Sequence, residues 1–489
     1  MTTRKNWLKV WALLLTLCML FSAVGCNESG SDSDVSVNYG DDVYIDDDDD
    51  FVEDGDGTTT VTTTQQGNAG SGSGGQGTSG GNVGSVKGHE INEQAKSDFL
   101  KSVPKKFSGT TVKILVFWKP GDAEKAKMEK FTEATGIKIQ WITETGDYLQ
   151  KLSALKIQGN APDLASIRNS DYPMVIMQDY FEPLSYGKLD YSDTSVYDTT
   201  VMNQYAWDGK VYGAAIKGSS MMPFNVLYYN TEMFSKVGMK TPRQLWEAGN
   251  WNWDTFRSMC IEAKSKMKTT AAVTCEYFGH MLVPTANTSY TKISNGKLVN
   301  NMNDPNLLKG WSFVNELQEI DKVLDVGMNR GSWIEQKCPM FIDGNYYLQK
   351  GDYFEKNVKF KYDYVPLPSP AGQQLAVGST LQLWGFPKGS KNAEAAAYVL
   401  RYWWDSAFDE AGNERWIDEK AKEFNNWLWE QHKVFECDGI VAYDGSYTNT
   451  EMYGELSSAG AANVRSVLDR WSGVITANIN AVEKEFGKK

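Results

Sequence analysis

Histidine is scarce in this 489-residue sequence, which has three, at positions 89, 280 and 432. So few imidazoles give little support to a histidine-based nucleophilic triad or to a metal site made of several histidines. We therefore expect no catalytic residues, no metal and no cofactor. Cysteine is also sparse, with four thiols beyond residue 26, at 260, 275, 338 and 437. Four thiols allow three full pairings, of which Cys260–Cys275 is the nearest in sequence, and buried free thiols are an equal alternative.

Lysine and arginine are absent from residues 27–86, which carry 13 acidic residues, among them the run Asp46–Asp50. This composition buries too little apolar surface to offset chain entropy, so we expect a disordered acidic and Gly-Ser-Thr tether over residues 26–95. The aspartate run lacks the ligand spacing of a calcium loop. The whole chain carries −13, but residues 87–489 carry only −3. A clustered basic face for nucleic acid is therefore not expected.

Long apolar runs are missing except for Val10–Phe21, which follows the positive residues Arg4, Lys5 and Lys9. The run is shorter than the roughly 20 residues of a membrane span and fits a signal peptide over residues 1–25. The segment 22–26, Ser-Ala-Val-Gly-Cys, resembles a bacterial lipobox, with Ala23 where leucine is commonest. The resemblance implies a lipid (palmitate) anchor on Cys26 and an extracytoplasmic protein. A conventional cleaved signal with an incidental cysteine is the alternative.

The remaining residues, 96–489, exceed the usual size of one hydrophobic core, so two lobes are expected. Their first part alternates strand and helix patterns, which favours an α/β fold with a mainly parallel sheet flanked by helices. The predicted elements are strand 111–118, helix 122–135 ending at Gly136, strand 137–142, helix 148–158 and strand 164–167. Ligands bind beyond the carboxyl ends of such strands. This places Trp118, Lys119, Asn169 and Asp171 at one candidate site.

Turn and cap signals mark the next elements. Asp208-Gly209 predicts a hairpin, Thr231 is expected to cap a helix that ends at Gly238, and another helix begins near Trp253. Aromatic residues are abundant, with 17 Trp and 24 Tyr. Core packing accounts for most aromatic side chains in a protein, but this high number of Trp and Tyr also suits a groove in which aromatic rings stack on sugars.

Several ordered pieces of the chain resemble the extracellular solute-binding proteins of ABC importers, in the branch that binds sugars and includes maltose-binding proteins. The resemblance covers nearly all of residues 108–480. Its pieces are the strand ending in Trp118, then Phe131–Ile137, Gly159–Asp163, Trp207–Gly213, Leu227–Asn230 with Phe234 and Gly238, Trp253–Phe256, Met340–Tyr346, Val365–Pro368, Gly378–Pro387 and Ser390–Ala395. Each piece is weak alone, but their shared order and spacing are specific.

The resemblance implies two α/β lobes, each a mainly parallel sheet flanked by helices, joined by strands that cross near residues 216–220 and 378–385. Lobe 1 would comprise about 108–216 plus 384–430, and lobe 2 about 220–380 plus 435–489. A ligand would bind in the cleft between the lobes. The resemblance also implies hinge closure on the ligand and recognition of the closed form by the membrane-embedded permease subunits, with the binding protein acting as a monomer.

Carried over by position, the family's pattern suggests further ligand contacts. Tyr346 matches a stacking aromatic, and Tyr277 matches a pocket contact. Trp384 lies on the return strand, while Lys217, Ser219 and Asn225 lie on or beside the crossing strand. The third-strand aromatic of maltose-type members is absent, since Ile167 or Arg168 stands there, which places maltodextrin itself in doubt.

The predicted function is capture of a carbohydrate, most simply an oligosaccharide, for an ABC importer. The tether length favours a Gram-positive surface. The alternative is a surface glycoside hydrolase, for which carboxylates such as Asp163, Asp171, Glu335 and Asp343 are available. A structural adhesin is a third possibility that the tether alone permits. Peptide ligands also remain open.

Overall fold

The computed structural model describes residues 92–486 apart from 169, 220–222, 295–296, 380–381, 410–414, 436–439 and 442–448. All of these belong to the compact unit Tyr44–Lys489. The predicted signal peptide, Cys26 and the tether up to residue 91 lie outside the described residues, as do Asn169 and Cys437. Within the described part of the chain, no helix is both long enough and apolar enough to cross a membrane.

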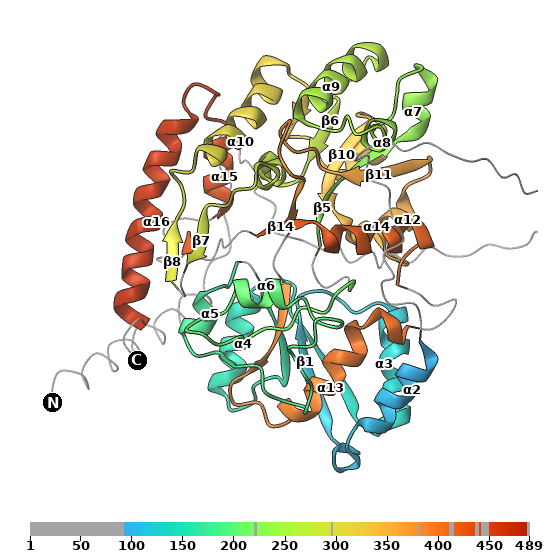
Figure 1. The fold of residues 1–489 in the computed structure, drawn as a ribbon, viewed down its shortest axis with the longest axis vertical. Coiled ribbons are helices and arrows are strands. Elements are labelled where there is room, and N and C mark those ends of the chain that lie inside the picture. The colour runs from blue at the N-terminus through green and yellow to red at the C-terminus, as the bar shows by residue number, and fades with distance from the viewer. Residues whose placement is uncertain are drawn as a thin grey trace, which may run out of the picture. The chain divides into compact units, whose positions relative to one another are not determined.

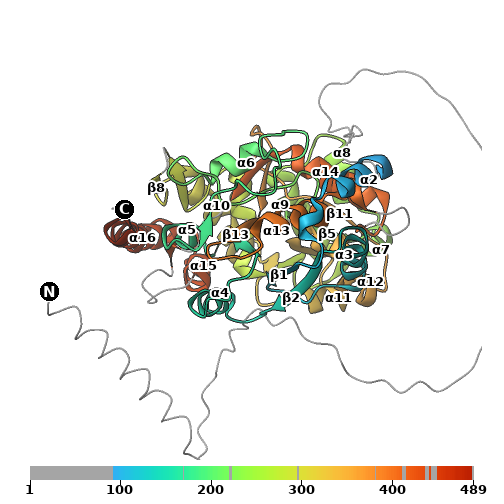
Figure 2. The ribbon, with the colours of Figure 1, turned by 90° about the horizontal axis from the view of Figure 1, so that it is seen from below.

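Helices and strands alternate through most of the unit (Figures 1 and 2). The helices are α2 (Glu93–Ser102), α3 (Asp122–Thr135), α4 (Tyr148–Ile157), α5 (Met174–Met177), α6 (Thr199–Gln204), α7 (Thr231–Lys236), α8 (Pro242–Glu247), α9 (Trp253–Met267), α10 (Pro305–Asn315), α11 (Arg330–Ile334), α12 (Tyr353–Asn357), α13 (Ala393–Trp404), α14 (Glu419–Glu430), α15 (Asn449–Ser457) and α16 (Val464–Phe486). The shorter 3₁₀ and π segments are η1 (Lys105–Phe107), η2 (Tyr277–Ala286), η3 (Glu316–Ile320), η4 (Asn345–Leu348) and η5 (Ser406–Phe408). The strands are β1 (Thr111–Val116), β2 (Lys138–Thr143), β3 (Leu164–Arg168), β4 (Phe181–Glu182), β5 (Asn225–Asn230), β6 (Val273–Cys275), β7 (Thr291–Ser294), β8 (Lys297–Asn300), β9 (Leu324–Asp325), β10 (Met340–Gly344), β11 (Tyr362–Pro366), β12 (Ala376–Ser379), β13 (Gln382–Pro387) and β14 (His432–Phe435).

Two five-stranded sheets define the two lobes. The first has the order β2-β1-β3-β13-β4, and the second has the order β11-β5-β10-β6-β9. In the first sheet β1 is parallel to β2 and β3, whereas β13 is antiparallel to β3 and β4. In the second, β6 is parallel to β10 and β9, whereas β5 is antiparallel to β10 and β11. The predicted two-lobed α/β class is confirmed, but the sheets are mixed rather than mainly parallel, because the strands next to the lobe crossings enter in the opposite direction.

The first lobe follows the sequence pattern closely. Helix α3 begins and ends as predicted, and Gly136 terminates it in the left-handed conformation at φ 76°. Its buried side chains are Met128 and Phe131, and the ring of Phe131 packs on that of Tyr402 in α13 at a centroid distance of 5.0 Å. In Figure 1, helices α2, α3 and α13 lie on one flank of this sheet, with α4 and α5 on the other. The Asp208-Gly209 hairpin is also confirmed, with φ 50° and 70° and a bridge between Trp207 and Lys210.

Three predicted boundaries differ from the structure. The tether was expected to reach residue 95, but α2 begins at Glu93, and Phe99 stacks on Phe408 at a centroid distance of 5.0 Å. The side chain that caps α7 is Asn230, which accepts from two backbone N–H groups, rather than Thr231. Lobe 1 was expected to extend to residue 430, but α14 packs on the second lobe.

The evidence for the placement of α14 is its aromatic contacts. Phe424 and Trp427 pack against Trp246 at centroid distances of 6.0 and 4.9 Å, and Phe424 also packs against Tyr364 at 5.0 Å. Because α13 belongs to the first lobe and α14 to the second, the chain passes between the lobes a third time between these two helices. Burial of the apolar face of α14 against α8 and β11 determines which lobe it joins.

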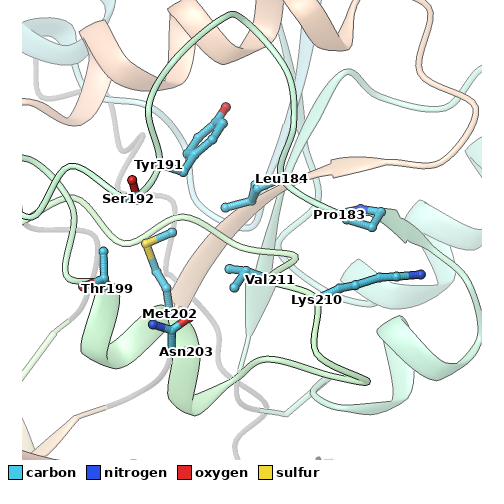
Figure 3. A pocket seen from close by; sticks show the side chains of 9 residues that line it. All are labelled: Pro183, Leu184, Tyr191, Ser192, Thr199, Met202, Asn203, Lys210 and Val211. Atoms are coloured by element: carbon cyan, nitrogen blue, oxygen red, sulfur yellow. The ribbon is translucent and has the colours of Figure 1, made fainter.

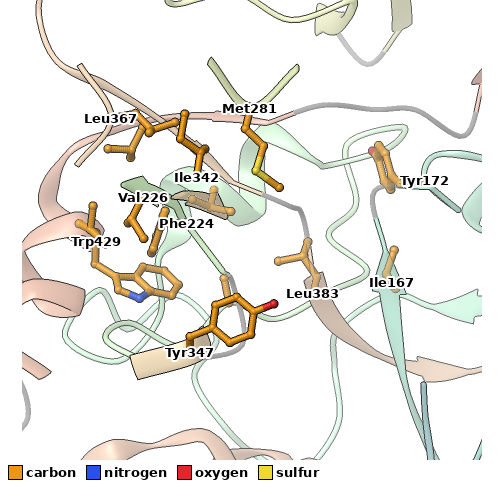
Figure 4. Close-up of a cluster of buried hydrophobic side chains, with 14 of the residues drawn as sticks. Ile167, Tyr172, Phe224, Val226, Met281, Ile342, Tyr347, Leu367, Leu383 and Trp429 are labelled. Atoms are coloured by element: carbon orange, nitrogen blue, oxygen red, sulfur yellow. The ribbon is translucent and has the colours of Figure 1, made fainter. Parts of the chain in front are cut away.

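The hydrophobic core extends through both lobes without interruption. Figure 4 shows Ile167 and Leu383 from the first sheet and Val226 and Ile342 from the second among its buried members. The two crossing segments pair with each other: Ala214 forms a bridge with Trp384 on the first-lobe side, and Phe224 forms a bridge with Ser379 on the second-lobe side. The predicted crossing regions are thus adjacent strands that carry the chain between the lobes.

The described cysteines, Cys260, Cys275 and Cys338, are free and buried. Burial raises the pKa of Cys338 to about 12 and raises those of the other two thiols as well. We expect all three to resist iodoacetamide at pH 8 in the folded chain and to be alkylated after unfolding, with or without reductant. Peptide mapping by mass spectrometry measures this. A disulfide-linked Cys260–Cys275 peptide would contradict it.

Candidate functional site

The carboxyl ends of β1 and β3 form the first edge of the candidate site. Trp118, just beyond β1, is partly buried, and its Nε1 donates to Glu124 Oε2 at 3.3 Å. Trp403 Nε1 donates to the other oxygen, Glu124 Oε1, at 2.7 Å. One carboxylate at the start of α3 therefore orients two indoles. Lys119 is exposed.

Five indoles gather at this edge, and we call them the tryptophan cluster: Trp118, Trp141, Trp384, Trp403 and Trp404. The ring of Trp384 lies 4.7 Å from that of Trp403 and 5.9 Å from that of Trp118. Its exposed fraction is 0 %. Trp384 was predicted to be a ligand contact on the return strand, but the structure leaves its ring no free face. The packing of α13 over β13 covers it, which places Trp384 in the core and not at the ligand site.

Asp171 lies beyond β3 and is already engaged. It forms a bidentate pair with Arg168, at 2.7 Å from Nε and 2.9 Å from Nη2. The guanidinium of Arg168 lies 4.6 Å from the ring centre of Tyr148. The guanidinium at the strand end is thus held on one side by the carboxylate of Asp171 and on another by the ring of Tyr148. Sequence reasoning selected the carboxylate, but Arg168 is the more exposed partner.

The predicted residues at the crossing bond within the protein. Ser219 is buried and donates to Ile216 O at 2.7 Å. Its own carbonyl accepts from Trp429 Nε1 at 3.0 Å. Asn225 is buried in β5, against Gly378, where an added Cβ would lie 2.8 Å from Asn225 Nδ2. These two residues are held within the crossing region, whereas Lys217 is only partly buried.

The second edge is formed by β10 and β6, which run parallel and end side by side. Tyr346, in η4 just after β10, donates its hydroxyl to Asp343 Oδ1 at 2.7 Å. Tyr347 donates to Asp343 Oδ2 at 3.2 Å, and Arg330 Nη1 donates to the Tyr347 hydroxyl at 2.7 Å. The backbone N–H of Arg330 donates to Glu276 Oε1 at 3.2 Å.

We call these residues the tyrosine–aspartate cluster: Glu276, Arg330, Asp343, Tyr346 and Tyr347. Burial raises the pKa of Asp343 to about 7, although the hydrogen bond from Tyr346 opposes the shift. Tyr346 is partly buried. Tyr277 begins η2 directly after Glu276, and its side chain lies outside what the structure describes.

A short segment links the two clusters. The backbone of Lys350 donates to Arg415 O at 2.8 Å, and that of Ile417 donates to Leu348 O at 2.9 Å. The Arg415 guanidinium lies 4.5 Å from the ring centre of Trp404. The residues just after η4 are thereby tied to the tryptophan cluster of the other lobe. A void too small for a water molecule lies here, lined by Gly218, Ser219, Trp404, Ser406, Asp409, Arg415 and Trp416.

A larger cavity of about 510 Å³ lies within the first lobe (Figure 3). Its lining comes only from residues 183–211, with Leu184, Met202 and Val211 as its apolar part. None of the predicted ligand contacts lines it. Because one lobe supplies all of its wall, hinge closure would not complete it, and we do not assign the main ligand to it. Among the described residues, no group of three His, Cys, Asp or Glu side chains is placed to hold a metal ion.

Comparison with protein families decides the class. The family model for bacterial extracellular solute-binding proteins matches residues 126–408, more than half of the chain. The chain belongs to the bacterial extracellular solute-binding protein family. Membership places the protein outside the cytoplasm. A search of curated protein sequences gives no match.

Solved structures similar to this solute-binding protein have the same fold. A cycloalternan complex of an ABC substrate-binding protein from Listeria monocytogenes has a TM-score of 0.52 and 16% identity, covering 78% of this chain and 100% of that one. The sugar-binding protein MalE of Xanthomonas citri has a TM-score of 0.57 and 13% identity, covering 78% of this chain and 100% of that one. UgpB of Mycobacterium tuberculosis, solved with glycerophosphocholine, has a TM-score of 0.58 and 14% identity, covering 76% of this chain and 98% of that one. These low identities support the two-lobed fold alone.

Sequence reasoning missed several residues of the candidate site in this solute-binding protein. Arg330 precedes no recognisable motif, and only its contact with Tyr347 reveals it. Arg415 lies on the unpredicted third passage between the lobes, and Trp404 is the last residue of α13, directly before that passage. Asp343 was noted only as a carboxylate. The motif Asp-Gly-Asn-Tyr-Tyr at 343–347 was a usable signal, because its aspartate precedes two tyrosines by three and four residues.

Proposed function

We propose that this protein binds a carbohydrate, most simply an oligosaccharide, between its lobes and delivers it to the permease of an ABC importer. The observation that carries the proposal is Tyr346, a partly buried ring at a strand end whose hydroxyl is held by Asp343 at 2.7 Å. An oriented aromatic face is suited to the apolar face of a pyranose ring. Arg330 and the Arg168–Asp171 pair add the charged hydrogen-bonding groups that sugar hydroxyls require.

Support also comes from relatives of this fold. The Listeria protein was solved with cycloalternan, and a cyclo/maltodextrin-binding protein at TM-score 0.56 was solved with maltotetraose. We infer that Trp118, Lys119, Asn169, Asp171, Lys217, Ser219, Asn225, Tyr277 and Tyr346 lie on or beside the ligand cleft. Closure would hinge on the three passages between the lobes, and the ligand would favour the closed state.

Binding without chemistry is part of the proposal. The four carboxylates considered for a glycoside hydrolase have other partners. Asp343 accepts from the hydroxyls of Tyr346 and Tyr347, and Asp163 accepts from Lys113 N at 2.9 Å and from Ser390 Oγ at 2.7 Å. Asp171 pairs with Arg168, and Glu335 pairs with Lys337 at 2.5 Å. A hydrolase needs one acid and one base or nucleophile across a bond. These bonds leave the ligand-transport function better supported.

We further infer that Cys26 carries the lipid, that residues 1–25 are the signal peptide and that the segment up to residue 91 is the spacer. The protein would act as a monomer on the outer face of a Gram-positive cell membrane. Metabolic labelling with a palmitate analogue is expected to mark the wild-type chain and not a Cys26→Ser variant. Equal labelling of both would refute the anchor.

The function is tested by thermal shift of the purified chain against mono- and oligosaccharides, with glycerophosphocholine included. A sugar at 100 times its Kd should stabilise the protein by about 2.7 kcal/mol. Calorimetry then gives the Kd, and chromatography of the incubated sugar looks for products. Sugar turnover would establish an enzyme instead. A response to glycerophosphocholine alone, or to no sugar, would overturn the carbohydrate assignment.

A further inference from the structure

Asp343 occupies an unusual position for a carboxylate. It is 1 % exposed at the next-to-last position of strand β10, and its oxygens accept from three groups: the hydroxyls of Tyr346 and Tyr347 and the backbone N–H of Gly344, the last at 2.7 Å. A buried carboxylate costs free energy unless hydrogen bonds satisfy it. Here two of the three donors are phenols next to each other in the chain. The carboxylate therefore fixes the directions of both hydroxyls.

Gly344 holds the ring of Tyr346 from another side. A Cβ added at Gly344 would lie 2.2 Å from Cε1 and 2.6 Å from Cδ1 of Tyr346. The ring therefore rests on the glycine backbone, where any other residue would displace it. Tyr347 packs against the same ring at a centroid distance of 4.5 Å and an interplanar angle of 61°. Three contacts thus define the plane of one ring.

Charged and titratable groups surround Asp343 from every neighbouring element. Glu276 follows β6 and Arg330 begins α11. Tyr228 lies on β5, and its hydroxyl donates to Gly344 O at 2.7 Å. Cys275 ends β6, and Tyr346 and Tyr347 lie in η4. Glu276 raises the pKa of Asp343 in addition to burial, while the tyrosine hydrogen bonds lower it.

We propose that Asp343 is a positioning residue, which holds the ring of Tyr346 against Gly344 so that the ring's remaining face is set for the ligand. This inference rests on the proposed function. It adds that affinity depends on a carboxylate that the ligand itself does not touch. It also adds that affinity depends on pH, because a carboxylate accepts from both hydroxyls, whereas a protonated carboxyl must use one oxygen as a donor.

The expected effects are measurable by calorimetry on the full-length chain. Tyr346→Phe removes one hydrogen bond to a charged group and should weaken affinity roughly 10-fold. Asp343→Asn should weaken it roughly 5- to 10-fold. The double variant should bind within about twofold of Tyr346→Phe, since Asp343 acts through the Tyr346 hydroxyl.

The pH profile separates positioning from general structural damage. Wild-type affinity should fall several-fold as the pH is lowered from 8 to 6, through the pKa of about 7 of Asp343. The Asp343→Asn profile should be flat. Asp352 provides a control, because it is a partly buried carboxylate of the second lobe, desolvation raises its pKa to about 6, and it accepts from Tyr353 N at 2.6 Å. Asp352→Asn should bind with wild-type affinity and keep the wild-type profile.

The outcomes distinguish the two proposals. If wild type binds a sugar, and Asp343→Asn shows the same affinity and pH profile, positioning by Asp343 is wrong while the proposed function stands. If the two substitutions add fully in the double variant, Asp343 acts by another route and the inference is overturned. If wild type binds no sugar, the proposed function fails and the inference fails with it. Should Asp343→Asn not fold, Tyr346→Phe reports the same bond, and an unchanged affinity there would also overturn the inference.

Discussion

Replacing Trp384 with alanine is expected to lower the free energy of unfolding by about 3–5 kcal/mol. The indole is fully buried in the tryptophan cluster, and its removal would leave a cavity between Trp118, Trp403 and Trp404. Among the described residues its Nε1 has no hydrogen-bond partner, so the loss is one of packing rather than of a hydrogen bond. Urea denaturation followed by circular dichroism measures the change.

Two further variants sharpen this prediction. Trp384→Phe keeps most of the buried surface and should cost clearly less than Trp384→Ala. Trp207→Ala changes a partly buried indole of the hairpin outside the cluster and should also cost less. If Trp384→Ala retained wild-type stability and lost ligand affinity, the residue would be a ligand contact after all, and the assignment to the core would be wrong.

The contrast between Trp384 and α3 shows what a sequence pattern can and cannot predict. Helix α3 was predictable to the residue because its signals are local: a Pro-Gly break precedes it, and Gly136 must adopt a positive φ after it. The orientation of Trp384 depends on α13, which follows it in sequence but covers it in space. All six residues of β13 are buried, so burial alone does not tell a ligand contact from a core residue, and only the packing of α13 over the strand places Trp384 in the core.

Asp163 shows how a recognised motif can have a structural role. The sequence pieces ending at Asp163 and starting at Ser390 were noted separately for family resemblance. In the structure they form one network: Asp163 Oδ1 accepts from Ser390 Oγ at 2.7 Å and from Asn392 N at 2.9 Å. Its Oδ2 accepts from Lys113 N at 2.9 Å. The carboxylate ties β1 to the start of α13, which explains why these pieces occur together without placing them at the ligand site.

The third passage between the lobes had no sequence signal of this kind. Its described part runs from Asp405 to Asp409 and from Arg415 to Asp418, and it pairs with Leu348 and Lys350 by single backbone hydrogen bonds. Isolated bridges of this kind produce no alternation of apolar and polar residues from which a strand could be predicted. The candidate site was therefore predictable at its strand ends, where Trp118 and Tyr346 lie, but not at the connection that ties the lobes together.

Replacing Lys433 with methionine is expected to destabilise the protein by about 3–5 kcal/mol. Lys433, on β14 of the second lobe, pairs with Asp198, the cap of α6 in the first lobe, at 3.2 Å, and the side chains are only 10 % and 8 % exposed. Methionine keeps the length of the chain but leaves the aspartate charge buried and unpaired. Truncating one partner of a buried pair costs more than the pair contributes.

A double variant tests the cause of this loss. Asp198→Asn keeps a side-chain oxygen that can accept the hydrogen bond from Val201 N. In the wild type this bond goes to Asp198 Oδ1 at 3.0 Å. Combined with Lys433→Met, it removes both charges and should recover more than half of the stability lost by Lys433→Met alone. Additive losses would show that the pair is not the source of the effect. The pair connects the lobes beside the first crossing. The double variant should therefore also change ligand affinity, because it alters the balance between open and closed states. Removing a pair within one lobe, such as Arg243–Asp363, should leave ligand affinity unchanged.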